Sequence, residues 1–218
     1  WIPVLHEAIF AGKEKDIKGI KNSYPEILNK MTSDEAASVM DFCLNHSLAH
    51  KRLGCQPLAF GAVGYFLNDE KFAQYQKTIV EEIHSWLNSD TAVLSIGQNI
   101  FKCLSGVAYR IPQDILAEIC CQFIDKHYSR WHMDMFKFIA NYIDLTKMSD
   151  ESAYRLVEHI NAVLDNEKER EQINYSATFL CVLRKQNRTL TESLDKKVAQ
   201  YFPEYYNGIY KLETTLND

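Results

Sequence analysis

Several kinds of segment are missing from this 218-residue sequence. No stretch approaches eighteen consecutive apolar residues, so a transmembrane helix is not predicted. Six cysteines are too sparse for a small domain that is held together by disulfide bonds. The net charge of −5 argues against a protein whose main role is to neutralise phosphates, although an acidic protein can carry a local basic face.

The familiar signatures of catalytic sites are missing as well. The sequence contains no Gly-rich phosphate loop, no HExxH, no GxSxG and no Asp-rich diphosphate motif. We therefore predict no catalytic residue, no cofactor and no metal, and we favour a non-enzymatic protein over an enzyme.

The composition that is present suits a packed globular chain. Hydrophobic residues make up 46% of the sequence and aromatic residues 12%, which is ample for a core. No Gly/Ser/Pro-rich linker divides the chain, so we predict a single domain over 1–218. The first residue is Trp1 rather than Met, which indicates a fragment or a processed product and is compatible with a removed leader. The sparse cysteines favour a cytoplasmic location.

The apolar residues recur at helical spacing over most of the chain, and no Val/Ile/Thr-rich run alternates for long enough to predict a strand. We therefore predict an all-α protein of about ten or eleven helices. Capping signals predict five helix starts, near 33, 68, 111, 149 and 190. The signals are Thr32–Glu35, Asn68–Glu70, Ile111–Asp114, Ser149–Glu151 and Thr189–Glu192.

These starts lie about 35 to 43 residues apart, and each interval holds a second helix, beginning near Pro57, Ser89, Arg130 and Glu169. A helix pair that recurs about every forty residues resembles HEAT or armadillo repeats, over roughly residues 33–200. The resemblance implies a right-handed superhelical stack of about four helix pairs, with an irregular helical bundle as the alternative fold. Residues 1–32 would then form an N-terminal cap and residues 201–218 a C-terminal tail.

One of the second helices is expected to be buried on several sides. Residues 131–145 are apolar on nearly every face, which is typical of a helix in the middle of a stack. The following six apolar residues cannot all face one side of a helix: Met135, Phe136, Phe138, Ile139, Tyr142 and Ile143.

The stretch from Cys43 to Cys55 places two cysteines and two histidines, His46 and His50, in one short window. Zinc takes four nitrogen or sulfur ligands, and Cys43, His46 and His50 would share one side of a helix. The alternative is that Cys43 belongs to the buried stripe of this helix, together with Val39 and Met40. The spacing matches no established zinc pattern, so we favour structural thiols over a metal site.

Other groups that could carry chemistry have plainer interpretations. Cys120 and Cys121 are adjacent in a helix, a poor geometry for a disulfide. His127, Trp131, His132 and Asp134 could form an acid–base set, but the histidines are equally well explained by a favourable interaction with the dipole at a helix C-terminus. We interpret Glu81–Glu82 as part of a solvated helix face. One cluster of basic residues stands out in the sequence: Arg184, Lys185, Arg188, Lys196 and Lys197. The nearby acidic residues Glu192 and Asp195 offset its charge, so we do not predict nucleic acid as a partner.

Two functions fit this sequence. The first is a scaffold or protein-interaction module that offers a groove to a protein or peptide partner. The alternative is a nucleic-acid-binding or DNA-repair-type HEAT-like enzyme, although the basic residues, tryptophans and catalytic aspartate of such glycosylases are not matched here. If the second helices line a concave face, their polar positions off the apolar stripes form the contact set. These candidates are Gln98, Lys102, His132 and Lys137.

Overall fold

The structure is a computed structural model of the whole chain, and it describes residues 30–50, 55–88, 100–101, 104–126, 132–166 and 178–207. Regular structure within these ranges is entirely helical, without a strand, which confirms the all-α prediction. The chain divides into two compact units, residues 1–108 and 109–218. Each is described by itself, and a single cooperative array stays a prediction.

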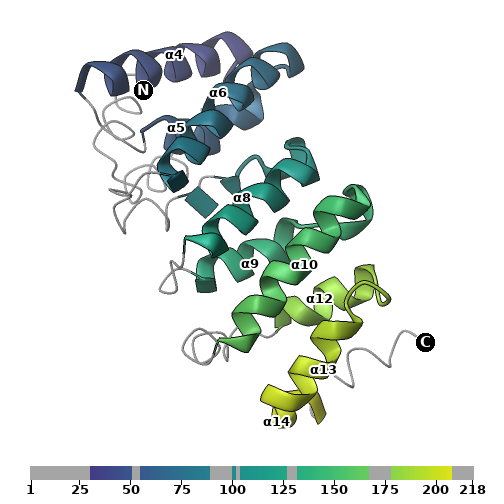
Figure 1. Cartoon of the computed structure of the whole chain (residues 1–218). Coiled ribbons are helices and arrows are strands. Elements are labelled where there is room, and N and C mark those ends of the chain that lie inside the picture. Colours follow the sequence, from purple (N-terminus) through teal and green to yellow (C-terminus); the bar gives the residue numbers. More distant parts are fainter. Residues whose placement is uncertain are drawn as a thin grey trace. The chain divides into compact units, whose positions relative to one another are not determined.

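In its described residues, unit 1 contains three named helices and one short turn, and residues 100, 101 and 104 are also helical. The named elements are α4 (Ser33–His50), α5 (Cys55–Val63), the 3-10 turn η1 (Gly64–Phe66) and α6 (Asp69–Asn88) (Figure 1). α4 packs on both α5 and α6, and α5 packs on α6. The shared core contains Met40, Phe60 and Ile79, and the rings of Phe60 and Phe72 lie 5.0 Å apart.

A close approach of two glycines fixes the last described segment of unit 1 against α5. A Cβ atom added at Gly106 would lie 2.2 Å from the carbonyl oxygen of Gly61, well inside van der Waals contact. Only a residue without a side chain therefore fits at Gly106, and the turn after Leu104 sits directly on the α5 backbone.

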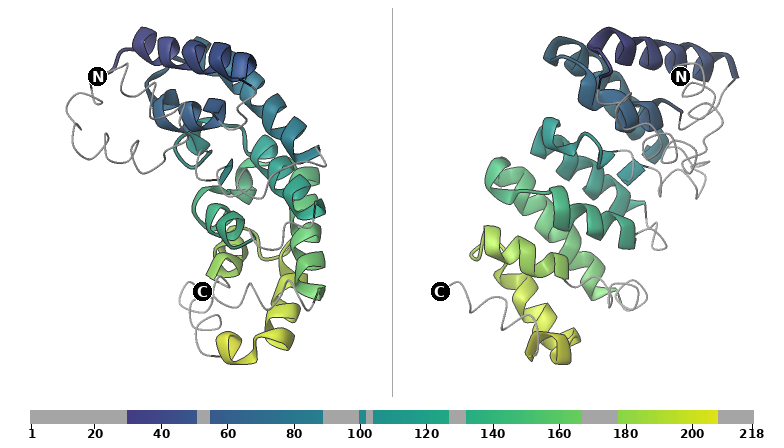
Figure 2. Two further views of the ribbon diagram at one scale, coloured as in Figure 1. Left: turned by 90° about the vertical axis from the view of Figure 1, so that its left-hand side faces the viewer. Right: turned by 180° about the vertical axis from the view of Figure 1, so that it is seen from behind.

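Unit 2 begins just after the 3-10 turn η2 (Ala108–Arg110) has started, and it holds six helices and one further turn in its described residues. These are α8 (Gln113–Asp125), α9 (His132–Tyr142), η4 (Leu145–Lys147), α10 (Asp150–Asp165), α12 (Thr178–Gln186), α13 (Glu192–Tyr201) and α14 (Pro203–Tyr205). α8, α10 and α13 pack one on the next, while α9 packs on α12. The helices of unit 2 thus form two rows, a first row of α8, α10 and α13 and a second row of α9 and α12, which separate clearly in the left view of Figure 2.

A similar hydrogen bond joins two helices in each unit. In unit 1 the amide of Asn68 donates to Ser33 Oγ at 2.9 Å, and in unit 2 the amide of Ser149 donates to Asp114 Oδ1 at 2.9 Å. Both pairs are 35 residues apart, and both join the residue just before one helix to the first turn of an earlier helix. Each bond therefore spans a sequence distance similar to the spacing of the predicted helix starts, and the repeat itself stays a prediction.

The far ends of the same helices carry a second recurrent contact. Asp125, the last residue of α8, pairs with His159 of α10 at 3.0 Å, and Asp165, the last residue of α10, pairs with Lys197 of α13 at 2.6 Å. Each first-row helix of unit 2 is thus joined to the next by an aspartate at its carboxyl end. These partly exposed pairs set the register of the row more than its stability.

Most of the predicted helix starts are confirmed by cap geometry. Thr32 and Glu35 form a reciprocal capping box, with Glu35 N to Thr32 Oγ1 at 3.2 Å and Thr32 N to Glu35 Oε2 at 2.8 Å. Asn68 and Ser149 cap the amides of Lys71 and Ser152. The second helices predicted from Pro57 and Arg130 correspond to α5 and α9. Those predicted from Ser89 and Glu169 start outside the described residues.

The capping box predicted at Thr189 is wrong. α13 starts at Glu192, and the residue before it, Thr191, makes no side-chain cap bond. The hydroxyl of Thr191 donates instead to the carbonyl of Asn187 at 2.7 Å, while Asn187 Oδ1 accepts from the amide of Leu190 at 3.0 Å. Asn187 closes its own local turn before α13, and this turn displaces the predicted cap.

Burial of α9 agrees with the prediction except at its end. Met135, Phe136 and Ile139 have no exposed surface, and Phe138 and Ile143 are each 3% exposed. Tyr142, predicted to be part of this buried set, is 37% exposed. α9 ends at Tyr142, so this side chain leaves the packed row and faces a groove.

Candidate functional site

A groove of about 650 Å³ lies in unit 2, where the turn before α8, the end of α9 and the turn before α10 come together. Three segments contribute to the groove: the residues before α8, the residues between α9 and α10, and the end of α12, where Gln186 lines the wall. The lining residues are Tyr109–Gln113, Ala140–Asp144, Lys147 and Gln186.

Two tyrosines give the groove its aromatic surface. Tyr109 projects from η2 and is 62% exposed, and Tyr142 projects from the end of α9. The ring of Tyr142 lies against the buried ring of Phe138, with centroids 5.1 Å apart. This contact holds the Tyr142 ring in place, so one aromatic wall is ordered before any partner arrives.

Tyr142, Ile143 and Asp144 line the groove, and we call the backbone of residues 142–145 its floor, which Gln113 bonds from one side. Gln113 is the first residue of α8, and its Nε2 donates to the carbonyl of Tyr142 at 3.1 Å. Its Oε1 accepts from the amide of Asp144 at 2.9 Å. One side-chain amide thus pairs with a carbonyl and an amide two residues apart, as a neighbouring strand would.

Gln186 fixes the alternate backbone groups of the same segment. Its Oε1 accepts from the amide of Leu145 at 2.9 Å, and its Nε2 donates to the carbonyl of Ile143 at 2.9 Å. Four backbone groups, one on each of residues 142–145, are therefore paired by two glutamines, one at the start of α8 and one at the end of α12. The segment is held at the depth that leaves Tyr142 exposed.

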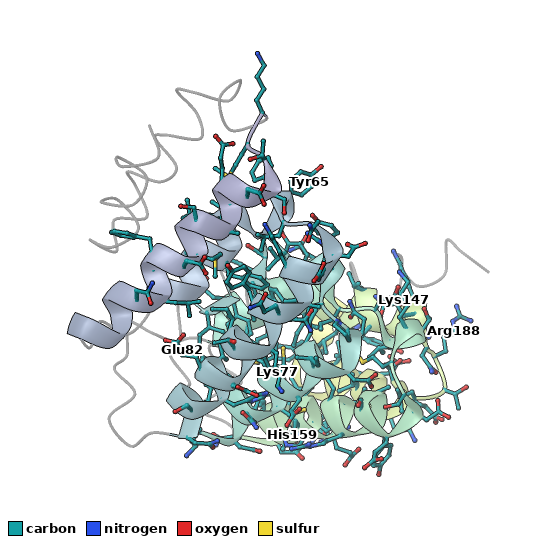
Figure 3. The ribbon with its side chains drawn as sticks, turned by 90° about the horizontal axis from the view of Figure 1, so that it is seen from above. Tyr65, Lys77, Glu82, Lys147, His159 and Arg188 are labelled. Carbon is teal, nitrogen blue, oxygen red and sulfur yellow. The ribbon has the colours of Figure 1, made fainter. Side chains whose placement is uncertain are left out.

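The charges around the groove are largely balanced. Asp144 caps η4 by accepting from the amide and hydroxyl of Thr146, and its carboxylate lies 2.9 Å from Lys147 Nζ. The Thr146 hydroxyl bond, followed by that of Lys147, lowers the pKa of Asp144 from its usual value. Lys147, which projects at the edge of the ribbon in Figure 3, is therefore a screened cation rather than an isolated one.

Three short turns share a residue pattern that the helical periodicity did not reveal. η1, η2 and η4 begin with a buried residue, Gly64, Ala108 or Leu145, which lies five residues before the start of α6, α8 or α10. The second position points outward, with Tyr65 64% exposed at the place that Tyr109 occupies in η2 (Figure 3). In each case the five residues before the helix are, in order, a buried residue, an exposed residue, a variable residue, an apolar residue and the residue that precedes the helix. This pattern could have predicted from the sequence that Tyr109 is exposed.

The four partner-binding residues predicted from the sequence mostly fall outside the described parts. Gln98 and Lys102 are not in the described residues, and His132 is described only as the first backbone position of α9. Lys137 is exposed on α9. Its carbonyl accepts from Asn141 Nδ2 at 2.6 Å, so Lys137 lies one turn before a residue that lines the groove.

Cysteines behave as core residues wherever they are described. Cys43 is fully buried on α4, as predicted, whereas the side chains of His46, His50 and Cys55 lie outside the described residues. In the described part of the chain no group of three metal-ligating side chains gathers. Burial raises the pKa of Cys120 and raises that of Cys121 to about 12, so both are protonated thiols at neutral pH.

Of the basic cluster near the C-terminus, three members are ion-paired. Arg184 Nε lies 2.7 Å from Asp195, Lys196 Nζ lies 3.2 Å from Glu192, and Lys197 pairs with Asp165. These pairs weaken the field that a phosphate backbone would meet. The prediction that Glu192 and Asp195 offset the cluster is confirmed.

The interpretation of Glu81–Glu82 as a solvated face is wrong for Glu82. Glu81 is exposed, but Glu82 is partly buried, and burial raises the pKa of its carboxyl to about 7. Its Oε2 is shielded from solvent and makes no hydrogen bond with the described residues. Two adjacent helical residues point about 100° apart, so a charged pair in sequence need not share one environment.

Comparison with known proteins gives no relative to guide the assignment: no family model, curated protein or solved structure matches the chain. Among the helices that the structure describes, none is long and apolar enough to span a membrane.

Proposed function

We propose that this chain is a non-enzymatic protein-interaction module, built on a HEAT-like stack of helix pairs, that binds a peptide segment of another protein in the groove of unit 2. The observation that carries the proposal is the groove itself, with exposed Tyr109 and Tyr142 above a backbone floor that two glutamines hold rigid. Exposed tyrosines that are ordered in advance are the side chains that interfaces favour, because they bury area at low entropic cost.

The arrangement of the helices supports the stacked architecture. In unit 2, α8, α10 and α13 pack one on the next, and each unit has a hydrogen bond between residues 35 positions apart that joins two of its helices. Arrays of this kind bind through the surfaces that successive repeats add together. The groove is such a surface, since three segments of unit 2 supply its walls.

Lys137 extends the proposed surface along α9. It is exposed and lies four residues before Asn141, so both share one face of the helix. A segment that leaves the groove along α9 would pass over Lys137. The proposed contact set therefore consists of the groove residues and Lys137, which was predicted from the sequence.

The nucleic-acid alternative has less support. The groove contains one acidic residue beside its cations, and most of the basic cluster is consumed in ion pairs. A binding titration of labelled DNA and RNA at rising salt tests it, because phosphate-driven binding falls steeply with salt. We expect no such steep response.

The proposal itself is tested by selecting displayed twelve-residue peptides on the purified chain and measuring their affinity by calorimetry. We expect the selected peptides to bind wild type and to lose roughly tenfold or more on Tyr142→Ala. Tyr154→Ala is the matched control, because Tyr154 is 59% exposed on α10 and does not line the groove. Enrichment no greater than on an unrelated protein, or equal affinity for both variants, would refute the proposal.

A further inference from the structure

Recognition of an extended peptide by strand addition does not suit this groove. Strand addition needs a row of unpaired backbone amides and carbonyls. In the floor, the carbonyls of Tyr142 and Ile143 and the amides of Asp144 and Leu145 are already bonded to Gln113 and Gln186. A ligand strand would have to break these bonds before forming its own.

An amphipathic helix does not suit it either. Helix-in-groove recognition depends on apolar pockets that accept side chains at i, i+4 and i+7. The large aliphatic residues of this groove, Ile111 and Ile143, are each only 3% exposed because the fold already covers them. What remains open is aromatic and polar.

The open surface consists of flat rings and a few donors. Tyr109, Tyr142 and the exposed ring of Pro112 present planar or rigid apolar faces, and Asn141 and Lys147 stand exposed among them. A polyproline II segment has no internal hydrogen bonds, carries its carbonyls outward and needs aromatic platforms for its proline rings. Tyrosine hydroxyls and the ammonium of Lys147 are donors of the kind that such carbonyls require.

We infer that the groove of unit 2 binds a proline-rich segment of a partner protein in the polyproline II conformation, with the rings of Tyr109 and Tyr142 as its two aromatic platforms. This inference rests on the proposed function and names its partner class. The rigid floor suits a ligand that is itself preformed, since neither side then loses much conformational freedom on binding.

The probe is fluorescein-labelled decaproline, titrated with the full chain and followed by fluorescence anisotropy. A Gly-Ser decapeptide of the same length and a ten-residue oligothymidine are titrated in parallel. We expect saturable binding of decaproline alone, weakened roughly tenfold by Tyr142→Ala or by Tyr109→Ala and unchanged by Tyr154→Ala. Circular dichroism of each variant verifies that the helices are retained.

Other results overturn the inference in distinguishable ways. If decaproline fails to bind but selected peptides without proline bind in a Tyr142-dependent manner, the partner class is wrong and the proposed function stands. If no peptide binds, both are wrong. Binding of oligothymidine in place of decaproline would show that the rings stack on bases and that the site serves single-stranded nucleic acid. Equal affinity for the Gly-Ser peptide would show that the groove has no preference for proline.

Discussion

Gln186 is expected to contribute more to stability than a partly exposed glutamine normally does. Its side-chain amide bonds two backbone groups of residues that are each only 3% exposed, the amide of Leu145 and the carbonyl of Ile143. Truncation of Gln186 to alanine leaves both groups without these partners. Each buried unsatisfied group costs about 1–3 kcal/mol, and water entering the open groove will reduce that cost. We therefore expect Gln186→Ala to lower the free energy of unfolding by about 2–3 kcal/mol.

Gln113 provides the internal comparison. It makes the same two-bond contact, but its bond to the carbonyl of Tyr142 is exposed, so water can replace it. We expect Gln113→Ala to cost about 1 kcal/mol. Gln200→Ala, at an exposed position of α13, should change stability by less than about 0.5 kcal/mol.

Urea denaturation of the four proteins measures these differences, and amide hydrogen exchange assigns them to the groove. Gln186→Met keeps most of the side-chain volume and removes both hydrogen bonds. We expect this variant to speed exchange at Leu145 while leaving Asp144, which Gln113 holds, closer to wild type. A Gln186→Met protein with wild-type stability and an unchanged exchange rate at Leu145 would refute the reasoning, since the bonds would then contribute nothing.

Three further predictions concern the core, the pH response and the metal question. Ile139→Ala on the fully buried face of α9 should cost about 2–5 kcal/mol by urea denaturation, and a loss below about 0.5 kcal/mol would mean that α9 is peripheral. The folded pKa of Glu82, about 7, lies above its unfolded value, so its contribution to stability is complete below about pH 4.5 and is lost as pH rises to about 7. After allowance for solvent screening the loss is on the order of 1–2 kcal/mol, Glu82→Gln should abolish it, and Glu81→Gln, the control, should retain it. We expect elemental analysis of protein purified without added metal to find no stoichiometric zinc, and one zinc per chain that Cys43→Ser removes would overturn the preference for a core thiol.

The helix starts could be predicted because their signals are local. Thr32, Asn68 and Ser149 each accept a hydrogen bond from the amide three residues further on, so a short stretch of sequence carries both partners of the contact. Thr189 shows the limit of such local signals. Thr189 and Glu192 match the capping-box motif, but Asn187 closes a different turn just before α13.

The groove could not be predicted in the same way, because its parts are far apart in the sequence. Gln113 of α8 and Gln186 of α12 are far apart in the sequence, yet both bond the backbone of residues 142–145. Tyr142 was assigned to the core because a helix that is apolar on nearly every face gives no phase from which to identify an outward position. The end of α9 at Tyr142, rather than its periodicity, decides that this ring is exposed.

Two sets of contacts therefore have different structural roles within unit 2. The bonds from Asp114 to Ser149, from Asp125 to His159 and from Asp165 to Lys197 fix how far each first-row helix slides along the next. The glutamine contacts then fix the turns relative to those helices. Because the groove walls are turns, the shape of the groove depends on both sets of contacts. Substitutions of exposed turn residues should consequently alter the proposed peptide binding while leaving the helical fold intact.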